Sequence, residues 1–291
     1  MANDNNLEKL IEEYKLTEEE HSSISQNISE IFFKGKTKSK IPTAIFTIGP
    51  PGSGKTGLNG LAQKELNGNL VIVNNDELRP FHPRAEEIAK KHPKEYIKIT
   101  NEESKYWTDE LVDKTIEEGY NILYEGTGRK IEIFKRMIEK MLHHGYRIFI
   151  KAIAVNELNC LMSIVERYAG QVQHKGWGRI VSAKTFYKSY DAEMIETIDT
   201  LEKEGEISEV EVYIRSDEPT NPIKIYSTSQ KQYKDAKTAI IKGRKLDKIN
   251  AIKYYEQYFK RSKLKDKETE EILERMEEIH KHHKTIDDME L

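Results

Sequence analysis

The chain has 291 residues, 33% of them charged and 37% hydrophobic, and its formal net charge is −3. This length allows one large domain or two ordinary ones, and the nearly balanced charge excludes a general attraction to nucleic acid or to anionic membranes. The single cysteine, Cys160, excludes a disulfide within this sequence, and no apolar run approaches the roughly 18 residues of a membrane-spanning helix. Because no signal peptide opens the sequence, we expect a cytoplasmic protein.

Residues 1–40 predict two amphipathic helices. Apolar side chains recur at the spacing of one helix face in the first of them: Leu7, Leu10, Ile11 and Tyr14. Thr17 and Glu20 then have the spacing of a capping box, which marks the start of the second helix. We expect these helices to cover one face of the following domain, or alternatively to form a docking surface for a partner.

From residue 43 to about 226 the sequence alternates between strand and helix patterns. Strands are expected at 43–48, 70–73, 121–124, 147–155 and 209–214, with a candidate edge strand at 223–226. Helices are expected at 57–66, 84–91, 102–118, 131–143, 156–169 and 184–203. Several strands are near-continuous apolar runs, which are typical of strands buried on both faces of a parallel sheet. The sequence therefore predicts an α/β fold, a doubly wound and mostly parallel sheet with its site at the carboxyl ends of the strands.

Beyond residue 228 the pattern is helical. Apolar residues form three stripes: Tyr233, Ala236 and Ile240, ending at a predicted break at Gly243; then Ile249, Ile252, Tyr255 and Phe259; then Ile272, Met276 and Ile279. The histidines of 280–283 do not have the spacing of metal ligands on one helix face, so we expect a solvated tail there. We therefore expect an N-terminal helical segment at 1–40, a central domain at 41–228 and a C-terminal helical extension at 229–291.

A glycine-rich segment follows the first predicted strand and precedes a predicted helix. It fits the phosphate-binding pattern G-x-x-x-x-G-K-[ST] and consists of Gly49, Pro50, Pro51, Gly52, Ser53, Gly54, Lys55 and Thr56. The glycines let the backbone curl until its N–H groups point at phosphate oxygens, and the helix N-terminus adds a positive dipole. Lys55 would reach the outer phosphates and the Thr56 hydroxyl would bind Mg²⁺. The sequence therefore predicts a nucleoside triphosphate site, with ATP and Mg²⁺ as its ligands.

A second polar segment, 74–83, follows the second predicted strand. Asp76 lies at the strand end, where it could accept a proton from a substrate hydroxyl as a general base, or act only as a turn residue. Arg79 and His82 are candidates for substrate contact, although the His82-Pro83 pair could equally shape the loop.

A third polar segment, Glu125-Gly126-Thr127-Gly128-Arg129, follows the third predicted strand. Its glycines allow a ligand to approach the backbone closely. Glu125 and Thr127 offer an acceptor and a donor suited to a polyol or sugar, and Arg129 could hold a phosphate. A surface turn with incidental charge is the alternative.

A glycine-rich connection at about 167–183 resembles a lid. Arg167 and Arg179 lie in it and could stabilise the charge that develops on the transferred phosphoryl group. Arg167 could also be an ordinary surface ion-pair partner at a helix end.

Four segments together resemble the zeta toxin family, the kinase halves of bacterial epsilon–zeta toxin–antitoxin systems. They are GPPGSGKT at 49–56, NNDELRPFHP at 74–83, YEGTGR at 124–129 and VERYA at 165–169. The resemblance covers roughly residues 43–226 and implies a P-loop kinase fold. It also implies transfer of a phosphoryl group from ATP, with Mg²⁺, to a sugar hydroxyl of UDP-N-acetylglucosamine, and an antitoxin protein as partner.

The resemblance also assigns roles to the matching positions. Lys55 and Thr56 correspond to the residues that serve ATP and Mg²⁺, and Asp76 to the base that takes the hydroxyl proton. The other matching positions contact the sugar nucleotide or the phosphates: Glu125, Thr127 and Arg129 on the sugar side, and Arg167 and Arg179 on the phosphates.

Two alternatives remain open at this point. The segments after Asp76 and around Arg179 depart from the family pattern, so a kinase of the same fold could act on another nucleotide or small molecule. The helical ends also leave open a module that binds a nucleoside triphosphate without transferring its phosphate.

Overall fold

The structure is a computed structural model that describes residues 2–176, 178, 180–204, 206–216, 218, 221–247 and 267–287. Contacts divide the chain into two compact units, and we describe each by itself. Unit 1 comprises Met1–Ile45, Ala62–Glu125 and Ile138–Arg147. Unit 2 comprises Phe46–Leu61, Gly126–Met137 and Ile148–Leu291.

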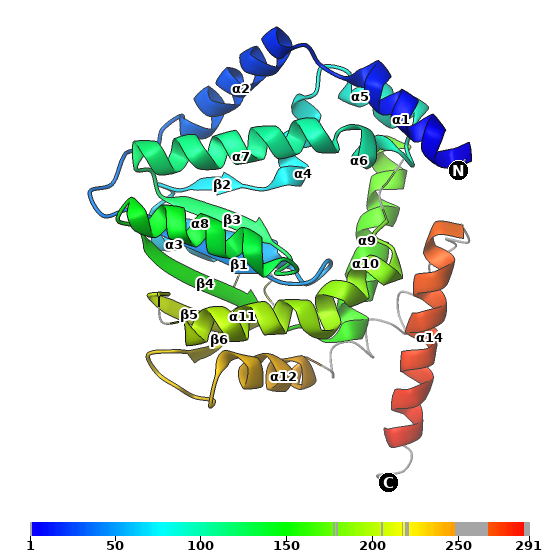
Figure 1. The fold of residues 1–291 in the computed structure, drawn as a ribbon. Helices are drawn as coiled ribbons and strands as arrows, with labels where there is room; N and C mark the ends of the chain where they lie inside the picture. Colours follow the sequence, from blue (N-terminus) through cyan, green and yellow to red (C-terminus); the bar gives the residue numbers. More distant parts are fainter. Residues whose placement is uncertain are drawn as a thin grey trace. The chain divides into compact units, whose positions relative to one another are not determined.

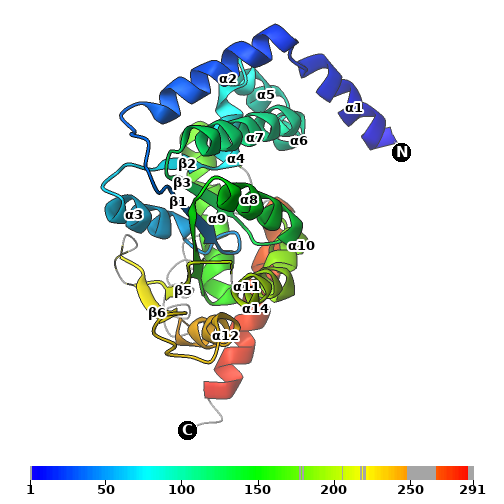
Figure 2. The ribbon, with the colours of Figure 1, turned by 60° about the vertical axis from the view of Figure 1, so that its left-hand side comes forward.

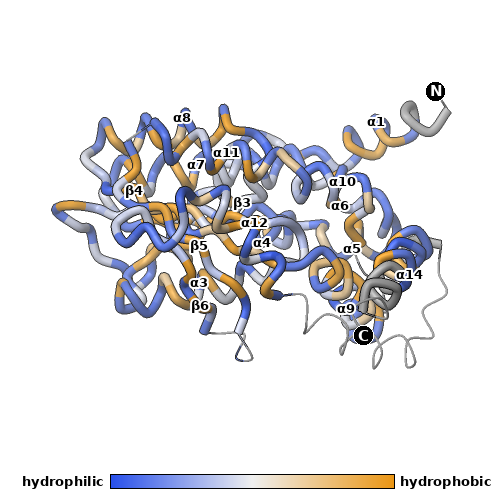
Figure 3. Tube along the Cα trace, turned by 90° about the horizontal axis from the view of Figure 1, so that it is seen from below, coloured by the Kyte–Doolittle hydropathy of each residue, from blue (hydrophilic) through white to orange (hydrophobic). Residues whose placement is uncertain are grey.

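In the described part of the chain, six strands form one sheet in the order β2-β3-β1-β4-β5-β6. Their bounds are Thr43–Ile48 (β1), Val71–Val73 (β2), Ile122–Gly126 (β3), Arg147–Ile153 (β4), Glu209–Ile214 (β5) and Ile223–Ser227 (β6). β2 pairs with β3 and β4 with β5 in parallel, whereas β6 is antiparallel to β5. Every residue of β1 is buried, as an apolar strand covered on both faces should be, and hydrophobic residues also dominate β4 (Figure 3). These observations confirm the predicted doubly wound, mostly parallel α/β fold.

Unit 1 carries the N-terminal helices. Its helical elements are α1 (Ala2–Tyr14), α2 (Glu18–Phe33), α4 (Asn75–Leu78), the 3₁₀ turn η1 (Arg79–Phe81), α5 (Ala85–Lys91), α6 (Tyr96–Ile99) and α7 (Asn101–Glu118). The predicted capping box is present, with both reciprocal hydrogen bonds between Thr17 and Glu20. Tyr14 of α1 is buried against Ile88 and Ile99, and α2 packs along α7, which lies beside α6 (Figure 2). The two first helices therefore cover α5 to α7, and a docking role for them stays a prediction.

Unit 2 contains most of the later helices. They are α9 (Glu157–Lys175), α10 (Ala183–Lys188), the π-helical turn η2 (Ser189–Glu193), α11 (Met194–Lys203), α12 (Ala236–Leu246) and α14 (Lys267–Asp287), while α3 (Lys55–Glu65) and α8 (Ile131–His143) contribute residues to both units. One core joins α9 to α10 and α14 through Leu161, Phe186 and Met276. α12 lies beside β5, β6 and α11 (Figure 1). Cys160 lies fully buried in this core, and burial raises the pKa of its thiol to about 12.

Three local predictions were wrong. Gly243 does not break its helix: α12 runs through it, because the missing side chain lets the helix approach Ala154 and Ile225, each 2.8 Å from where a Cβ would lie. The helix expected at 156–169 does not stop before Gly170: α9 continues to Lys175 and ends at Gly176 with a left-handed φ of 76°. The helix expected at 184–203 is divided into α10 and α11 by the π-helical turn η2.

Some expectations lie outside what the structure describes. The stripe Ile249, Ile252, Tyr255 and Phe259 falls wholly on undescribed residues, as do most side chains of 280–283. The third stripe is on α14, where Ile272 and Met276 are buried. Among the described residues, none of the helices is both long and apolar enough to cross a membrane.

A buried ion pair joins two neighbouring strands of unit 2. Lys151 on β4 is directly opposite Glu211 on β5, and their side chains form an ion pair although Lys151 is only 3% exposed. Glu211 also accepts hydrogen bonds from Lys224 (2.8 Å) and from the Tyr213 hydroxyl (2.8 Å). Burial opposes the charged form of Glu211, but these donors outweigh it and lower the pKa of the carboxyl. The pair is thus stabilised by several hydrogen bonds, which a buried charge requires.

Candidate active site

The phosphate-binding pattern forms a tight loop between β1 and α3 in unit 2. Gly52 and Gly54 have φ values of +76° and +84°, a region that residues with side chains rarely adopt. A Cβ on Gly52 would lie 2.1 Å from the carbonyl oxygen of Cys160, so α9 leaves no room for a side chain there. The Lys55 ammonium donates hydrogen bonds to the carbonyls of Gly49 (3.0 Å) and Pro50 (3.3 Å), which hold it over the loop.

Two hydroxyl groups of this loop are suited to an anion and its metal. Ser53 is fully buried, yet its Oγ has no hydrogen-bond partner among the described residues. Because buried polar atoms are nearly always paired, this orphan indicates a site built for an additional group. Thr56 is exposed in the first turn of α3, where a hydroxyl can reach a bound cation. Both features fit a triphosphate with Mg²⁺.

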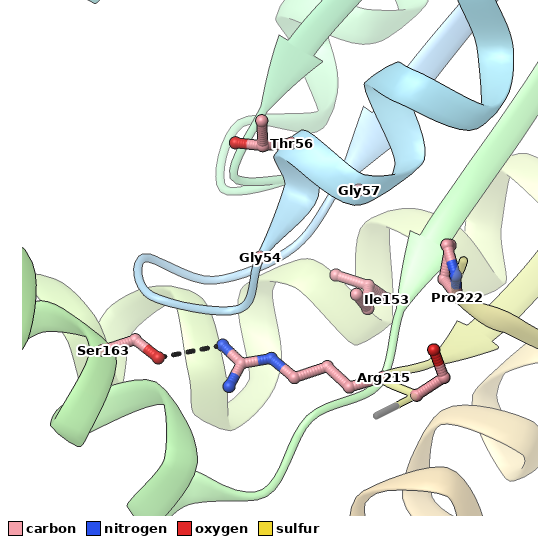
Figure 4. Close-up of a pocket in the computed structure, with 8 residues that line it drawn as sticks. Gly54, Thr56, Gly57, Ile153, Ser163, Arg215 and Pro222 are labelled. Carbon is pink, nitrogen blue, oxygen red and sulfur yellow. Dashed lines mark hydrogen bonds between the residues drawn. The ribbon is translucent and has the colours of Figure 1, made fainter. Parts of the chain in front are cut away.

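Arg215 contacts this loop and was not predicted as a site residue from the sequence. Its Nε donates to the Ser53 carbonyl at 3.1 Å, and its Nη2 donates to the Gly52 carbonyl and to Ser163 Oγ (3.1 Å) (Figure 4). Arg215 directly follows β5. The carboxyl ends of the strands are where the site of such a sheet is expected, so its position in the sequence was a usable signal. Its partners, in contrast, lie 52 or more positions away in the sequence.

A pocket of about 280 Å³ opens beside the loop in unit 2 (Figure 4). It is lined by Gly54, Thr56, Gly57, Ile153, Ser163, Arg215, Ser216 and Pro222. This lining combines an apolar wall with a few polar groups, which is typical of small-molecule sites.

The end of β3 is joined to the phosphate loop by a backbone hydrogen bond. The Gly49 N–H donates to the Gly126 carbonyl at 3.3 Å. Beyond it, the Thr127 carbonyl accepts a hydrogen bond from Ser189 (3.0 Å), and Arg129 forms an ion pair with Glu193 (3.1 Å). Both partners belong to the π-helical turn η2, a type of element that is frequent at functional sites. Contacts with η2 therefore hold the segment that carries Thr127 and Arg129, and the Arg129 side chain is 30% exposed.

Unit 1 holds Asp76 on a short helical turn. Asn74 caps this turn by accepting the Asp76 N–H at 3.0 Å, and the carboxylate, with about half of its side chain exposed, pairs with Arg79 at 3.0 Å. Arg79 is itself 5% exposed and also donates to three groups of the following helices: the Ile97 carbonyl, Thr100 Oγ1 and Asn101 Oδ1. Arg79 thus orients Asp76, which is a different role from the substrate contact that we expected.

A further carboxylate of unit 1, Glu77, experiences the negative charges of Asp76 and Glu125. Partial burial raises the pKa of Glu77, and the negative charges of Glu125 and Asp76 raise it further. Glu77 is not among the predicted site residues. The predicted residues Asp76 and Glu125 therefore belong to one region of negative potential within this unit.

His82 has a structural position in unit 1. Its ring is 2% exposed, its Nδ1 accepts the Arg84 N–H at 3.1 Å, and its Nε2 lies 3.0 Å from the Tyr14 carbonyl. The neutral tautomer with hydrogen on Nε2 satisfies both partners, and burial lowers the pKa of the ring. This geometry agrees with the alternative that His82 shapes its loop and leaves no ring nitrogen for a substrate.

Of the two arginines predicted to lie in a lid, the structure describes Arg167. Arg167 is exposed on α9, one helical turn beyond Ser163. Arg179 lies outside the described residues. The described geometry therefore includes only the first of the two.

Comparisons with known proteins identify a family. The model of the zeta toxin family matches residues 29–231. Toxin zeta of Enterococcus hirae is 27% identical over 205 residues, which are 70% of this chain and 70% of its own length. Toxin PezT of Streptococcus pneumoniae serotype 4 is 31% identical over 158 residues, 54% of this chain and 62% of its own length.

A solved structure shares the fold. It belongs to the PezAT chromosomal toxin-antitoxin system of Streptococcus pneumoniae, has a TM-score of 0.72 at 21% identity, and is matched over 85% of this chain and 99% of its own. Since the family model covers more than half of the residues, this chain belongs to the zeta toxin family, whose members are kinase-like, ATP-dependent toxins.

Proposed function

We propose that this chain is an ATP-dependent kinase that phosphorylates a sugar hydroxyl of a nucleotide sugar, with UDP-N-acetylglucosamine as the first candidate. The observation that carries the proposal is the phosphate loop, whose Gly52 has no room for a side chain and whose Lys55 lies over the loop. Membership of the zeta toxin family supports phosphoryl transfer as the reaction. The segments NNDELRPFHP and YEGTGR support the nucleotide sugar as acceptor.

The phosphate loop would hold the phosphoryl donor. Its backbone N–H groups and the N-terminus of α3 bind phosphate oxygens, and Lys55 neutralises the outer phosphates. The described residues contain no group of three or more histidine, cysteine or acidic side chains placed to hold a metal. Thr56 together with the phosphates would hold Mg²⁺, in keeping with the few protein ligands that this ion takes. When bound, the ion would neutralise charge on the β- and γ-phosphates.

The pocket beside the loop would receive the nucleoside part of the donor. Ile153 and Pro222 supply apolar surface for a flat base, and Ser216 supplies a polar group. The position next to Gly54 and Thr56 suits a ligand whose phosphates lie on the loop.

The acceptor chemistry needs a proton acceptor and charge stabilisation. The hydroxyl oxygen of the sugar attacks the γ-phosphorus, the bond between this phosphorus and the β–γ bridging oxygen breaks, and ADP leaves. The hydroxyl proton passes to the carboxylate of Asp76, which Arg79 orients. Glu125 and Thr127 would bind the sugar nucleotide, and Arg129, Arg167 and Arg179 the phosphates, where positive charge is most effective.

We also propose an antitoxin protein as partner. The solved relative belongs to a toxin–antitoxin system, and this chain belongs to the zeta toxin family, so we expect a partner that keeps it inactive in its own host. This proposal concerns a binding partner and is independent of the identity of the acceptor.

The kinase proposal is tested by measuring ADP formation with ATP and UDP-N-acetylglucosamine. We expect Lys55→Ala to abolish it and Asp76→Asn to lower kcat by about 10²- to 10⁴-fold, the usual contribution of a general base. Lys64→Ala, an exposed lysine on the same helix as Lys55, and Asp109→Asn, an exposed aspartate on α7, are the matched controls and should keep full activity.

The outcomes separate the reaction from the acceptor. If this sugar nucleotide does not stimulate turnover but another compound in a metabolite extract gains a phosphate, the acceptor is wrong and the kinase stands. If no compound gains a phosphate although ATP binds, the chain is an interaction module and the kinase proposal fails.

A further inference from the structure

Arg215 forms hydrogen bonds with backbone carbonyls of the phosphate loop. Its guanidinium donates to the carbonyls of two successive loop residues, Gly52 and Ser53. Gly54 is packed against the same side chain, since a Cβ there would lie 3.3 Å from Arg215 Nε. A planar fork with several donors suits this arrangement, because it can hold two carbonyls at once.

The same side chain also contacts α9. Arg215 also donates to Ser163 Oγ (3.1 Å), and the Ser163 hydroxyl donates to the Asn159 carbonyl of the preceding turn (2.9 Å). Ser163 and Arg167 are four residues apart and so share one face of the helix. The end of β5, the phosphate loop and the helix that carries Arg167 are thereby linked by one side chain within unit 2.

Peptide geometry gives this contact a consequence for phosphate binding. In a planar trans peptide the C=O and the following N–H point in opposite directions. Because the Ser53 carbonyl points at Arg215, the N–H of Gly54 in the same peptide points to the opposite side of the loop. The neighbouring peptide is held as well, through the Gly52 carbonyl on Arg215 and through the Ser53 N–H on the Pro50 carbonyl (3.2 Å).

We propose that Arg215 is a positioning residue of the kinase, which holds the loop with the Gly54 N–H turned toward the triphosphate of ATP. That the bound anion is the triphosphate of ATP rests on the proposed function. Arg215 acts through the backbone of Gly52 and Ser53 rather than by touching the phosphates. Holding the loop in its binding geometry removes an ordering cost that ATP would otherwise have to offset.

A direct role in binding the base is the rival explanation, because Arg215 also lines the pocket. The two roles predict different ligand dependence. A residue that shapes the phosphate loop affects every ligand with a triphosphate, whereas a residue that contacts the base affects ATP alone.

The experiment measures the affinities of ATP and of inorganic tripolyphosphate for wild type, Arg215→Ala, Arg215→Lys and Ser163→Ala. We expect Arg215→Ala to weaken both ligands by about 10- to 100-fold, the range for hydrogen bonds to a charged group. Arg215→Lys should recover part of the loss, and Ser163→Ala should weaken both ligands less. Arg136→Ala, an exposed arginine on α8 in the same unit, should bind both ligands like wild type.

Each outcome decides the proposal. Unchanged binding of tripolyphosphate, or a loss confined to ATP, overturns it, and the second result assigns Arg215 to the base. Thermal unfolding of each variant shows whether it is folded. If Arg215→Ala does not fold, the comparison rests on Arg215→Lys and Ser163→Ala, and equal affinities there refute the role. Wild-type protein that binds neither ligand refutes the proposed function itself, whereas wild-type binding with insensitive variants refutes only the role of Arg215.

Discussion

Gly52 provides the sharpest test of the loop geometry. Replacing it by alanine places a Cβ 2.1 Å from the carbonyl oxygen of Cys160 and keeps a residue with a side chain at a φ of +76°. The left-handed conformation costs about 1–2 kcal/mol, and forcing an extra carbon into a packed site typically costs about 1–3 kcal/mol. The backbone carbonyl of Cys160 lies within α9 and cannot move aside as a flexible side chain could. We therefore expect Gly52→Ala to lower the free energy of unfolding by about 2–5 kcal/mol.

Urea denaturation of Gly52→Ala beside wild type and Gly60→Ala measures this loss. Gly60 lies in the interior of α3, and a Cβ there meets no heavy atom within 4 Å. Gly60→Ala should therefore raise the free energy of unfolding by about 0.5–1 kcal/mol, through helix propensity alone. ATP binding of Gly52→Ala should fall together with its stability, because the loop has to move to accept the side chain. A Gly52→Ala protein as stable as wild type, with normal ATP affinity, would refute the packing that we describe.

Three further predictions concern buried groups. Burial lowers the pKa of His82, so the unfolded chain binds a proton on this ring at a higher pH than the folded chain does. The contribution of the neutral His82 ring to the free energy of unfolding is therefore complete above about pH 6.5 and falls as the pH drops below it. His82→Gln should flatten stability between about pH 5 and 7, which urea titrations can test against the exposed control His143→Gln; an unchanged slope would contradict the buried neutral ring. Lys151→Met should cost about 3 kcal/mol, the lower end of the range for breaking a buried ion pair, because the Glu211 carboxylate loses Lys151 but keeps Lys224 and the Tyr213 hydroxyl as donors. The double variant Lys151→Met/Glu211→Leu should cost less, and a double-mutant cycle without coupling would count against the pair. The Cys160 thiol, with its pKa raised to about 12, should resist alkylation at pH 8 in native protein and react once urea unfolds the chain; rapid native labelling would show that the site is open.

The local features of the fold could be predicted because their causes are close in sequence. The capping box needs only Thr17 and Glu20, three positions apart. The phosphate loop needs glycines at fixed offsets, followed by Lys55 at the start of a helix. The buried strands are visible as apolar runs, as β1 shows. In each case the stabilising partner is a neighbour along the chain, so the residue pattern alone contains the information.

Single glycines and charged loop residues could not be interpreted in the same way. Gly243 and Gly170 lower helix propensity wherever they occur, but packing decides whether the helix continues, and α12 gains close contact with Ala154 that a larger residue would prevent. Arg215 follows a strand end as Asp76 does, yet its importance depends on the loop carbonyls that it meets more than 150 positions away.

The sequence by itself therefore determined the strand–loop–helix unit that binds phosphate, the alternation that produces the α/β sheet, and the family. Only the tertiary structure decided which polar side chains turn inward. Arg79 is buried among groups of residues 97–101, and His82 hydrogen-bonds a carbonyl 68 positions away. A polar residue is buried only where distant groups satisfy its hydrogen bonds, and the position of those groups depends on how the whole unit packs.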